Sequence, residues 1–307
     1  MYLKTIIFKI IYLCYRYLLY VKIVKPKIIV WMDGGIGSQM HQYLLGRIFK
    51  EKGYIVTYDL SWFKHNAKDV NRCFDRNFDL LKAFPYLDFK QSNRLERSIY
   101  MRFFAFKSNW FDHIEDDLFL YDLNPPKYLG GYYHSPKEVW TNLFPKYFKV
   151  SPLVLDSCNY LLYEEIKNNR QTTVGVHVRR GDLKTFNIAY GPPADILYFQ
   201  KAFSYFINKV ESPFFYFFSD EPKWIEEELI DKLSITEAEY KIVNINGSDK
   251  GYMDLFLIAT CSHQISSKGA FGKVGALLRD SKDKIVILIN DPLEYAWEKR
   301  LLNPVYL

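Results

Sequence analysis

Cysteines are few in this sequence, and they do not occur in the patterns in which cysteines usually act together. The four of them, at positions 14, 73, 158 and 261, lie far apart and form no C-x-x-C pair. This spacing argues against a zinc site and against a disulfide framework. It fits a reducing compartment, so we expect a cytoplasmic protein in which buried thiols behave as small apolar side chains.

Long uncharged apolar runs are also missing, which argues against a membrane-spanning helix. Residues 1–24 are apolar and aromatic, but Lys4, Lys9, Arg16 and Lys22 interrupt them, and a span needs about 20 apolar residues. No small-residue cleavage site follows an apolar core, so we expect no removable signal peptide. Two interpretations stay open. One is a peripheral helix at the inner face of a membrane, and the other is an amphipathic helix packed on the protein itself.

A strong excess of charge of one sign is absent as well. The 41 basic and 35 acidic residues give a net charge of +6, and the basic residues are dispersed along the chain. Nucleic-acid binding needs a basic stripe, so we expect no nucleic-acid partner. The modest positive balance is compatible with anionic substrates or anionic lipid surfaces.

Apolar and aromatic residues, by contrast, are abundant. Of the 307 residues, 49% are hydrophobic and 18% are aromatic, which indicates a globular chain long enough for two domains. In the second half, strand and helix patterns alternate regularly, which predicts βαβ units around a parallel sheet. The predicted strands are 173–178, 213–219, 240–245, 263–266 and 284–289, and the predicted helices are 195–210, 222–233, 251–261, 270–279 and 292–301.

The first half begins with a similar unit and then becomes harder to interpret. A strand at 27–32, a glycine-rich turn at 33–38, a helix from Gln39 and a strand at 54–59 form a β-loop-α-β start. Residues 60–127 have no clear period, and a further strand is expected at 128–133. A polar break at 169–171 suggests a domain boundary. We therefore expect an N-terminal helix at 1–24, an acceptor-side domain at 25–168 and a donor domain at 169–307.

Residues 173–182 form the most informative stretch of the chain. A β-branched run, typical of a strand buried on both faces, turns polar at its carboxyl end, where ligands bind in open α/β sheets. Because strand side chains alternate, His177 and Arg179 project to one face and Arg180 to the other. The guanidinium of Arg179, a planar fork with a permanent charge, suits the oxygens of a pyrophosphate. The alternative is a structural ion pair between Arg180 and Asp182 that caps the strand.

The glycine-rich turn is a second candidate for anion binding. Gly34, Gly35 and Gly37 let the backbone approach an anion where a helix begins, although a tight turn without a ligand is the alternative. A dinucleotide-binding unit also has such a turn, followed about 20 positions later by an acidic residue, here Asp59. Against that rival, the third glycine of its fingerprint falls on Met40, whose side chain would obstruct close packing of helix and strand.

Three segments together resemble the α1,2-fucosyltransferases of glycosyltransferase family 11. H-V-R-R-G-D at 177–182 is similar to the H-x-R-R-x-D signature of α1,2-, α1,6- and protein O-fucosyltransferases. G-G-I-G-S-Q-M-H-Q-Y at 34–43 resembles that family's G-G-L-G-N-Q-M-F-Q-Y, and F-F-Y-F-F-S-D at 214–220 resembles its F-F-x-F-S-D-D. The order and spacing agree across residues 27–290.

The resemblance implies an α/β fold of the GT-B type, with two Rossmann-like domains facing a cleft. It also implies transfer of L-fucose, with inversion, from GDP-β-L-fucose to a galactose hydroxyl of a glycan. The α1,2-linked product would belong to a surface polysaccharide or O-antigen, and the apolar N-terminus suggests that the acceptor is carried on a lipid. No D-x-D motif is present to hold a divalent ion, so we expect no metal and no cofactor, with phosphate met by arginine and N–H groups.

Several residue roles follow from the resemblance. Residues matching His177 and Asp254 contact guanine in fucosyltransferases with this signature, and a carboxylate suits the N1 and N2 edge of that base. For Asp254 the alternative is stabilisation of a helix N-terminus. Ser219 and Asp220 end a strand on the same side of the sheet, where they either reach the nucleotide or brace its loop. Arg179 is expected to stabilise the departing GDP.

The chain also departs from the family pattern. Ser38 replaces an Asn and His41 a Phe in the glycine turn, and residues 268–278 differ from N-S-S-F-S-W-W-G-A-W-L and lack the hydroxyls expected near the β-phosphate. Lys268, Lys273 or N–H groups of the helix start are candidate replacements. His41 and Asp33 are the candidate general bases, with a purely packing role as the alternative for His41. A different donor or linkage, or a non-catalytic binding relative, stays possible on these grounds.

Overall fold

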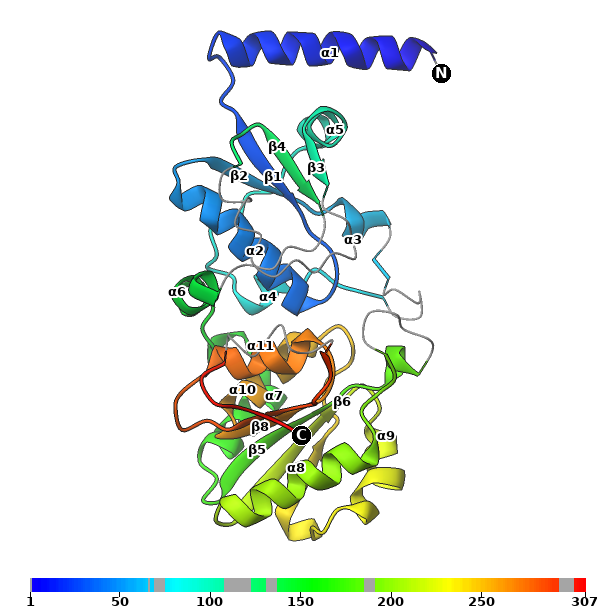
Figure 1. Cartoon of the computed structure of the whole chain (residues 1–307), viewed down its shortest axis with the longest axis vertical. Coiled ribbons are helices and arrows are strands. Elements are labelled where there is room, and N and C mark those ends of the chain that lie inside the picture. The colour runs from blue at the N-terminus through cyan, green and yellow to red at the C-terminus, as the bar shows by residue number, and fades with distance from the viewer. Residues whose placement is uncertain are drawn as a thin grey trace. The chain divides into compact units, whose positions relative to one another are not determined.

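The computed structural model describes residues 2–65, 67–68, 75–107, 123–130, 137–184, 191–292 and 301–307. The chain divides into two compact units, which are considered separately below (Figure 1). Unit 1 comprises Met1–Gly34, Ser38–Ala67 and Tyr86–Phe144, and unit 2 comprises Gly35–Gly37, Lys68–Pro85 and Pro145–Leu307. The boundary suggested by the sequence, between residues 168 and 169, therefore falls inside unit 2.

Unit 1 contains a four-stranded sheet in which all neighbouring strands are parallel. The strand order is β2-β1-β4-β3. The strands are β1 (Lys27–Trp31), β2 (Ile55–Asp59), β3 (Ala105–Lys107) and β4 (Lys127–Gly130), and the helices are α1 (Tyr2–Tyr20), α2 (Ile36–Glu51), α3 (Ser61–His65) and α5 (Arg94–Phe103). Strand β4 corresponds to the first part of the strand predicted at 128–133. Residues 131–133 lie outside the described ranges.

Helix α2 begins earlier than the sequence suggested, at Ile36 instead of Gln39. Gly34 has a φ of 70°, which a residue with a side chain rarely adopts, and the chain turns there directly into the helix. Gly37 therefore lies in the first helical turn and not in the loop. The apolar spacing did identify the buried face, because Met40 and Tyr43 are both fully buried.

Helix α1 packs one of its faces on unit 1. The hydroxyls of Tyr15 and Tyr100 are 2.9 Å apart, and the rings of Tyr12 and Phe103 stack at 4.1 Å between centroids. Tyr15 belongs to a cluster that includes Ile29 of β1. The packed-helix interpretation therefore holds for this face. Among the residues that the structure describes, no helix is long and apolar enough to cross a membrane.

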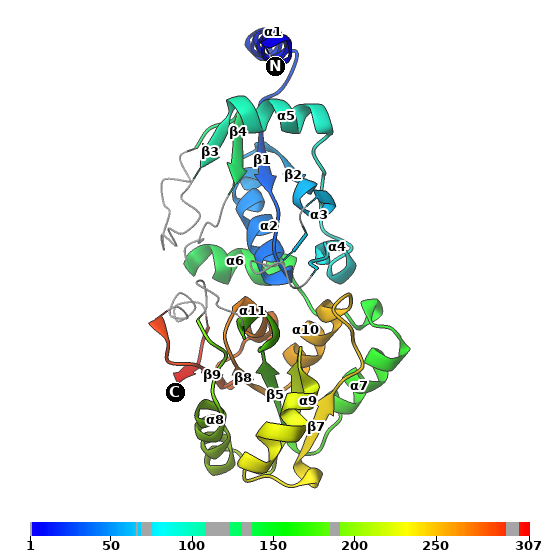
Figure 2. The same cartoon turned by 90° about the vertical axis from the view of Figure 1, so that its right-hand side faces the viewer.

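Unit 2 is built on a six-stranded, entirely parallel sheet of order β10-β9-β8-β5-β6-β7. Helices cover this sheet (Figure 2). The strands are β5 (Thr172–Val178), β6 (Pro213–Ser219), β7 (Tyr240–Val243), β8 (His263–Ser266), β9 (Val286–Leu288) and β10 (Pro304–Tyr306). The helices include α4 (Leu80–Ala83), α7 (Ser157–Lys167), α8 (Ile196–Lys209), α9 (Pro222–Trp224), α10 (Gly251–Thr260) and α11 (Ala270–Leu278), while α6 (Lys137–Tyr147) crosses the boundary between the units.

The two faces of β5 carry different neighbours, as side-chain alternation requires. Val174 and Val176 pack in one cluster with Phe203 of α8. On the opposite face Gly175 has no side chain, and an added Cβ would lie 2.7 Å from Ile258 Cγ1, so only glycine allows α10 to pack this closely. The same face carries His177 at the end of the strand.

Most predicted elements of unit 2 that lie in the described ranges are present, with two differences. Asp195 caps α8 as expected, because its carboxylate accepts a hydrogen bond from Tyr198 N. The predicted helix 222–233 is a short α turn followed by π and 3₁₀ turns, although Ile225 and Leu229 are both buried as a helical face would bury them. Strand β10 was not predicted. The helix expected at 292–301 lies almost entirely outside the described residues.

The predicted α/β class is confirmed, with two units each built on a parallel sheet, which is the GT-B type of composition. Of the cysteines within the described ranges, Cys261 is buried, whereas Cys14 and Cys158 are exposed on helix surfaces.

Candidate functional site

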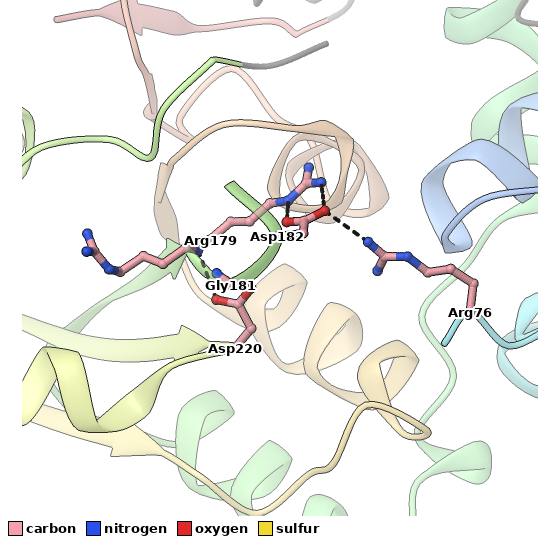
Figure 3. Close-up of polar contacts among 6 residues, drawn as sticks. Arg76, Arg179, Gly181, Asp182 and Asp220 are labelled. Atoms are coloured by element: carbon pink, nitrogen blue, oxygen red, sulfur yellow. Dashed lines mark hydrogen bonds and ion pairs between the residues drawn. The ribbon is translucent and has the colours of Figure 1, made fainter. Parts of the chain in front are cut away.

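The loop after β5 is held by the end of the neighbouring strand β6. The carboxylate of Asp220 accepts hydrogen bonds from Arg180 N at 2.9 Å and Gly181 N at 3.0 Å (Figure 3). The hydroxyl of Ser219 donates to the carbonyl oxygen of Val178 at 2.8 Å. Of the two roles considered for Ser219 and Asp220, these contacts are those of a brace for the loop.

The guanidinium of Arg179 is oriented by a buried carboxylate. Its Nε donates to Asp182 Oδ1 at 2.9 Å and its Nη2 to Asp182 Oδ2 at 2.6 Å. Arg76 Nη2 donates to the same Oδ2 at 3.1 Å. Burial raises the pKa of the Asp182 carboxyl, but hydrogen bonding and charge from Arg179, with further charge from Arg76, outweigh burial and hold that pKa below its usual value. The fork expected to face pyrophosphate thus faces Asp182.

The alternative pairing of Arg180 with Asp182 is wrong. The guanidinium of Arg180 lies 3.6 Å above the ring of Trp224, and its Nε is 3.6 Å from Glu221 Oε2. Arg180 therefore projects to the face of the sheet opposite Arg179, in line with the alternation along the strand. Asp182 is reached by Arg179 because the backbone turns into a short 3₁₀ helix at Gly181–Leu183.

His177 lies at the end of β5 against the first turns of α11. Its ring is 5.2 Å from that of Phe271 between centroids, and its Nδ1 is 3.3 Å from Ser267 Oγ. Burial, with the nearby charges of Arg179 and Lys273, lowers the pKa of His177 to about 3. The imidazole is therefore neutral at physiological pH, so it can pair one donor or acceptor of a ligand without adding charge.

The start of α11 brings two sequence motifs together within unit 2. Gly269, the N-cap, has a φ of 90°, and an added Cβ there would overlap Arg179 Nη1. Gly37 of the glycine turn also packs here, since an added Cβ would be 3.1 Å from Ala270 Cβ. A guanidinium and a helix N-terminus side by side form a positive centre at the carboxyl ends of the parallel strands.

The two lysines of the altered segment are both buried. Lys268 donates to Asp291 Oδ2 at 2.7 Å, so its ammonium is directed at that carboxylate. Burial and the charge of Arg179 lower the pKa of Lys273 well below its usual value. The altered segment itself carries no hydroxyl. Directly before it, however, Ser267 places its Oγ 2.9 Å from Arg179 N.

The other predicted residues lie around the start of α2. Gly34 and Gly35 form the turn, Ser38 lies in the first helical turn, and His41 is half-buried one turn later. Asp33 is buried, accepts a hydrogen bond from Gln42 Nε2 at 2.5 Å and donates from its own backbone N to Gln42 Oε1 at 3.0 Å. Burial raises the pKa of Asp33 to about 6.

Asp254 lies in the first turn of α10, in a polar network of its own. Asn246 Nδ2 donates to Asp254 Oδ1 at 2.7 Å, and Asn246 also exchanges hydrogen bonds with Asn159 of α7. Burial raises the pKa of Asp254 to about 7. The hydrogen bond from Asn246 favours the ionised carboxylate, but burial favours the protonated form more strongly.

Three residues of this region were not identified from the sequence. Arg76 lies in the stretch without periodicity, and nothing in the sequence connects it with Asp182. Asn246 and Ser267 are single polar residues at loop positions. For Ser267 a signal was available, because it forms a pair of serines with Ser266 at the end of the strand predicted at 263–266. Short polar residues that follow a parallel strand lie at the edge where ligands bind.

The dinucleotide-binding alternative is not supported by the geometry at Asp59. This carboxylate is buried and accepts hydrogen bonds from Tyr128 Oη at 2.8 Å and Ser61 N at 2.8 Å. Arg97 Nη1 lies 3.6 Å from its Oδ1. Asp59 therefore has a structural role inside unit 1 and does not present an acceptor to a ribose.

Comparison with known proteins places these features in a family. Residues 88–299 match the model of Glycosyl transferase family 11. The O-antigen biosynthesis glycosyltransferase WbnK of Escherichia coli is 24% identical over 285 residues, which cover 83% of this chain and 91% of that protein. Galactoside alpha-(1,2)-fucosyltransferase 2 of Pongo pygmaeus is 34% identical over 109 residues, covering 35% of this chain and 31% of that protein.

Solved structures give weaker likenesses. The fucosyltransferase NodZ from Bradyrhizobium is 15% identical with a TM-score of 0.45, covering 83% of this chain and 92% of that one. The ADP-heptose heptosyltransferase II of E. coli is 10% identical with a TM-score of 0.47, covering 92% and 90%. The match to the family model spans more than half of the sequence and includes the H-V-R-R-G-D segment. This chain belongs to glycosyltransferase family 11.

Proposed function

We propose that this member of family 11 transfers L-fucose from GDP-β-L-fucose to a galactose hydroxyl, with inversion and an α1,2 linkage. The observation that carries the proposal is the positive centre at the start of α11, where Arg179 Nη1 lies against Gly269 and the glycine turn packs through Gly37. Such a centre suits a diphosphate. The named activities of the galactoside fucosyltransferase relatives support the sugar and the linkage.

In this proposal each residue of the centre has a defined task. Arg179 meets the diphosphate with its Nη1 side, because Asp182 holds the other edge, and it stabilises the negative charge that develops on departing GDP. His177 and Asp254 are assigned to the guanine. Ser219 and Asp220 hold the loop, Lys268 supplies charge and Ser267 a hydroxyl beside it. Lys273, whose lowered pKa favours the neutral amine, is assigned as an uncharged donor there.

We propose that the reaction needs no metal ion. The charge of the leaving group is assigned instead to Arg179 and the helix N-terminus. For the acceptor, Asp33 and His41 are the candidate bases. Asp33 has a pKa of about 6 because of its burial, which suits proton transfer near neutral pH.

The acceptor and its location complete the proposal. The name of the WbnK relative supports a role in assembling a surface polysaccharide or O-antigen. We propose a galactose-terminated glycan carried on a lipid, fucosylated by an enzyme held at the inner face of the membrane. A second candidate function is transfer of another sugar or formation of another linkage, which the altered segment 268–278 favours.

The experiment is transfer from GDP-fucose to a galactose-terminated disaccharide, with NMR of the product to establish the linkage. We expect one fucose α1,2-linked to the galactose, and we expect no product with Arg179→Gln. A product with another linkage, or transfer from another sugar nucleotide only, would establish the second candidate. GDP binding without transfer to any galactoside would indicate a non-catalytic relative and contradict the proposal.

A further inference from the structure

Helix α1 is apolar on two opposite faces. Tyr12, Tyr15 and Leu19, spaced by three or four residues, lie on the face that packs on unit 1. A second series with the same spacing runs along the other side and is exposed to solvent: Ile6, Ile10, Leu13, Tyr17 and Tyr20. Residues three or four apart share one face of a helix, so this second series forms a continuous exposed stripe.

The exposure of this stripe is too large to be incidental. Leu13 is 62% exposed, Tyr17 64% and Tyr20 84%. Single exposed apolar residues are normal, but a contiguous row of them marks a surface that binds a partner or a membrane. Because the opposite face of α1 is used for packing, the stripe is not available to stabilise unit 1.

Charge along the helix indicates what the partner is. Lys9 and Arg16, both exposed, are two helical turns apart and border the stripe beside Leu13. The first acidic residue in the sequence is Asp33, so α1 carries cations and no carboxylate. An apolar row flanked by cations and aromatic hydroxyls matches a surface with anionic headgroups above hydrocarbon.

We propose that the exposed stripe of α1 docks the protein on an anionic phospholipid bilayer. Helix α1 would lie flat, with Ile10 and Leu13 below the headgroups and Lys9 and Arg16 at the phosphates. The two interpretations drawn from the sequence then both apply, one to each face. This proposal depends on α1 alone and not on the reaction assigned to unit 2.

The test is cosedimentation of the full-length protein with vesicles of phosphatidylcholine, with and without phosphatidylglycerol. Wild type is expected to bind the anionic vesicles and to bind them less as salt rises. Leu13→Asp with Tyr17→Asp should lower the partition coefficient at least tenfold. Leu161→Asp on α7 is the matched control, because Leu161 is 70% exposed in a helix of unit 2, and it should bind as wild type does.

A charge variant separates the two components of binding. Lys9→Gln with Arg16→Gln should weaken binding to the anionic vesicles about tenfold to thirtyfold, since each basic residue near such a surface is worth about 1 kcal/mol. Thermal unfolding of each variant checks that α1 still packs on unit 1. Equal binding by wild type and the Leu13/Tyr17 variant would overturn the proposal. So would a self-associated wild type in sedimentation velocity that this variant dissociates, because the stripe would then bind a second copy.

A different observation carries a second inference, at Arg76. The carboxylate oxygen Asp182 Oδ2 accepts from both Arg179 Nη2 and Arg76 Nη2, at 2.6 and 3.1 Å (Figure 3). Asp182 is only 5% exposed, whereas the side chain of Arg76 is 31% exposed. Arg76 therefore reaches from the side into the pair that orients Arg179.

We infer that Arg76 is a positioning residue, acting on Arg179 through Asp182. With Arg76 in place, one oxygen of Asp182 accepts hydrogen bonds from two cations. The carboxylate is therefore fixed in position, and Arg76 neutralises part of the negative charge that attracts Arg179. Without it, the whole charge of Asp182 would act on Arg179, which would weaken the hold of Arg179 on an anionic ligand. This inference rests on the proposed donor site.

A double-mutant cycle measured by calorimetric titration with GDP tests this inference. Arg76→Gln should weaken GDP binding about fivefold in the wild-type background and less than twofold in an Arg179→Gln background. Arg76→Lys should recover most of the affinity, because it restores the cation beside Asp182. Arg97→Gln is the matched control, since Arg97 lies beside the buried Asp59 in unit 1, and it should leave GDP binding unchanged.

The outcomes of this cycle are distinguishable. Losses that add in the double variant, or an unchanged affinity in Arg76→Gln, would overturn the role of Arg76 while leaving the donor site intact. An equal loss in Arg97→Gln would show general damage and would also overturn it. A wild-type protein with no affinity for GDP would contradict the proposed function itself, and the inference would fall with it.

Discussion

Asp254→Asn gives the sharpest test of the guanine assignment, because it changes chemistry while keeping shape. In the structure Asp254 Oδ1 accepts from Asn246 Nδ2 at 2.7 Å, and burial raises the pKa of Asp254 to about 7. If the carboxylate faces guanine, it accepts from N1–H and N2–H₂ only when ionised. The asparagine replaces one acceptor by a donor that would point at donors.

The expected size follows from the cost of unpaired groups. A buried donor left without an acceptor costs about 1 to 3 kcal/mol, so GDP should bind Asp254→Asn roughly five to 150 times more weakly at pH 8. The pH dependence has a definite sign. Below pH 7 the carboxyl of free wild type is protonated and must lose its proton to bind, so wild-type affinity should fall by up to about tenfold per pH unit. The variant should lack this component of the pH dependence, and what is left in it should follow the titration of the GDP phosphate near about pH 6.

Calorimetric titration with GDP and inosine diphosphate, from pH 5.5 to 8.5, measures these effects. Inosine diphosphate lacks the 2-amino group, so it should bind wild type more weakly than GDP does and lose less in Asp254→Asn. The difference between the two losses is the coupling between Asp254 and that amino group. Equal losses for both nucleotides, or the same pH profile in both proteins, would show that Asp254 only supports the start of α10.

Three further predictions concern the glycines, the buried acid and metal. Gly269→Ala should lower kcat/KM for GDP-fucose at least tenfold by displacing Arg179. Gly53 is the control, because it has a similar φ of 83° but no atom within 4 Å of an added Cβ, so Gly53→Ala should cost about 1 kcal/mol of stability and leave the kinetics unchanged. Equal kinetics in the two variants would contradict this prediction. Asp33→Asn should raise the urea concentration at the unfolding midpoint at pH 8 but not at pH 4. Because burial raises the pKa of Asp33 to about 6, its ionisation destabilises the folded protein as the pH rises through about 4 to 6, and the asparagine removes that cost. An equal shift of the midpoint at both pH values would refute this prediction. Fucose transfer should continue in the presence of EDTA. A transfer rate that EDTA abolishes and added Mn²⁺ restores would show a metal requirement.

The fold was predictable where burial leaves a clear pattern. The strands β5, β6 and β8 lie within one residue of their predicted bounds, because parallel strands buried on both faces are continuous apolar runs between polar turns. The irregular turns at 222–232 were not predictable, since Ile225 and Leu229 have the same spacing in an α or a π turn. Strand β10 has only three residues, too few for a period to show.

The site was predictable by position but not by contact. The alternation along β5 correctly placed His177 and Arg179 together, as both lie against α11. It could not reveal that Asp182 holds the guanidinium of Arg179, because that pairing depends on how the chain turns at Gly181. Nor could it reveal Arg76, which is 106 positions from Asp182 in sequence and lies in a stretch without hydrophobic periodicity.

The central claim is that the centre around Arg179 holds the diphosphate of GDP. The most direct measurement is the GDP dissociation constant of Arg179→Lys against wild type, with UDP as the reference nucleotide. One ammonium cannot both satisfy Asp182 and contact phosphate as the guanidinium does. We predict that wild type prefers GDP to UDP and that Arg179→Lys weakens GDP binding about thirtyfold or more, the equivalent of roughly 2 to 3 kcal/mol. An unchanged GDP affinity in Arg179→Lys would remove Arg179 from the donor site and contradict the account.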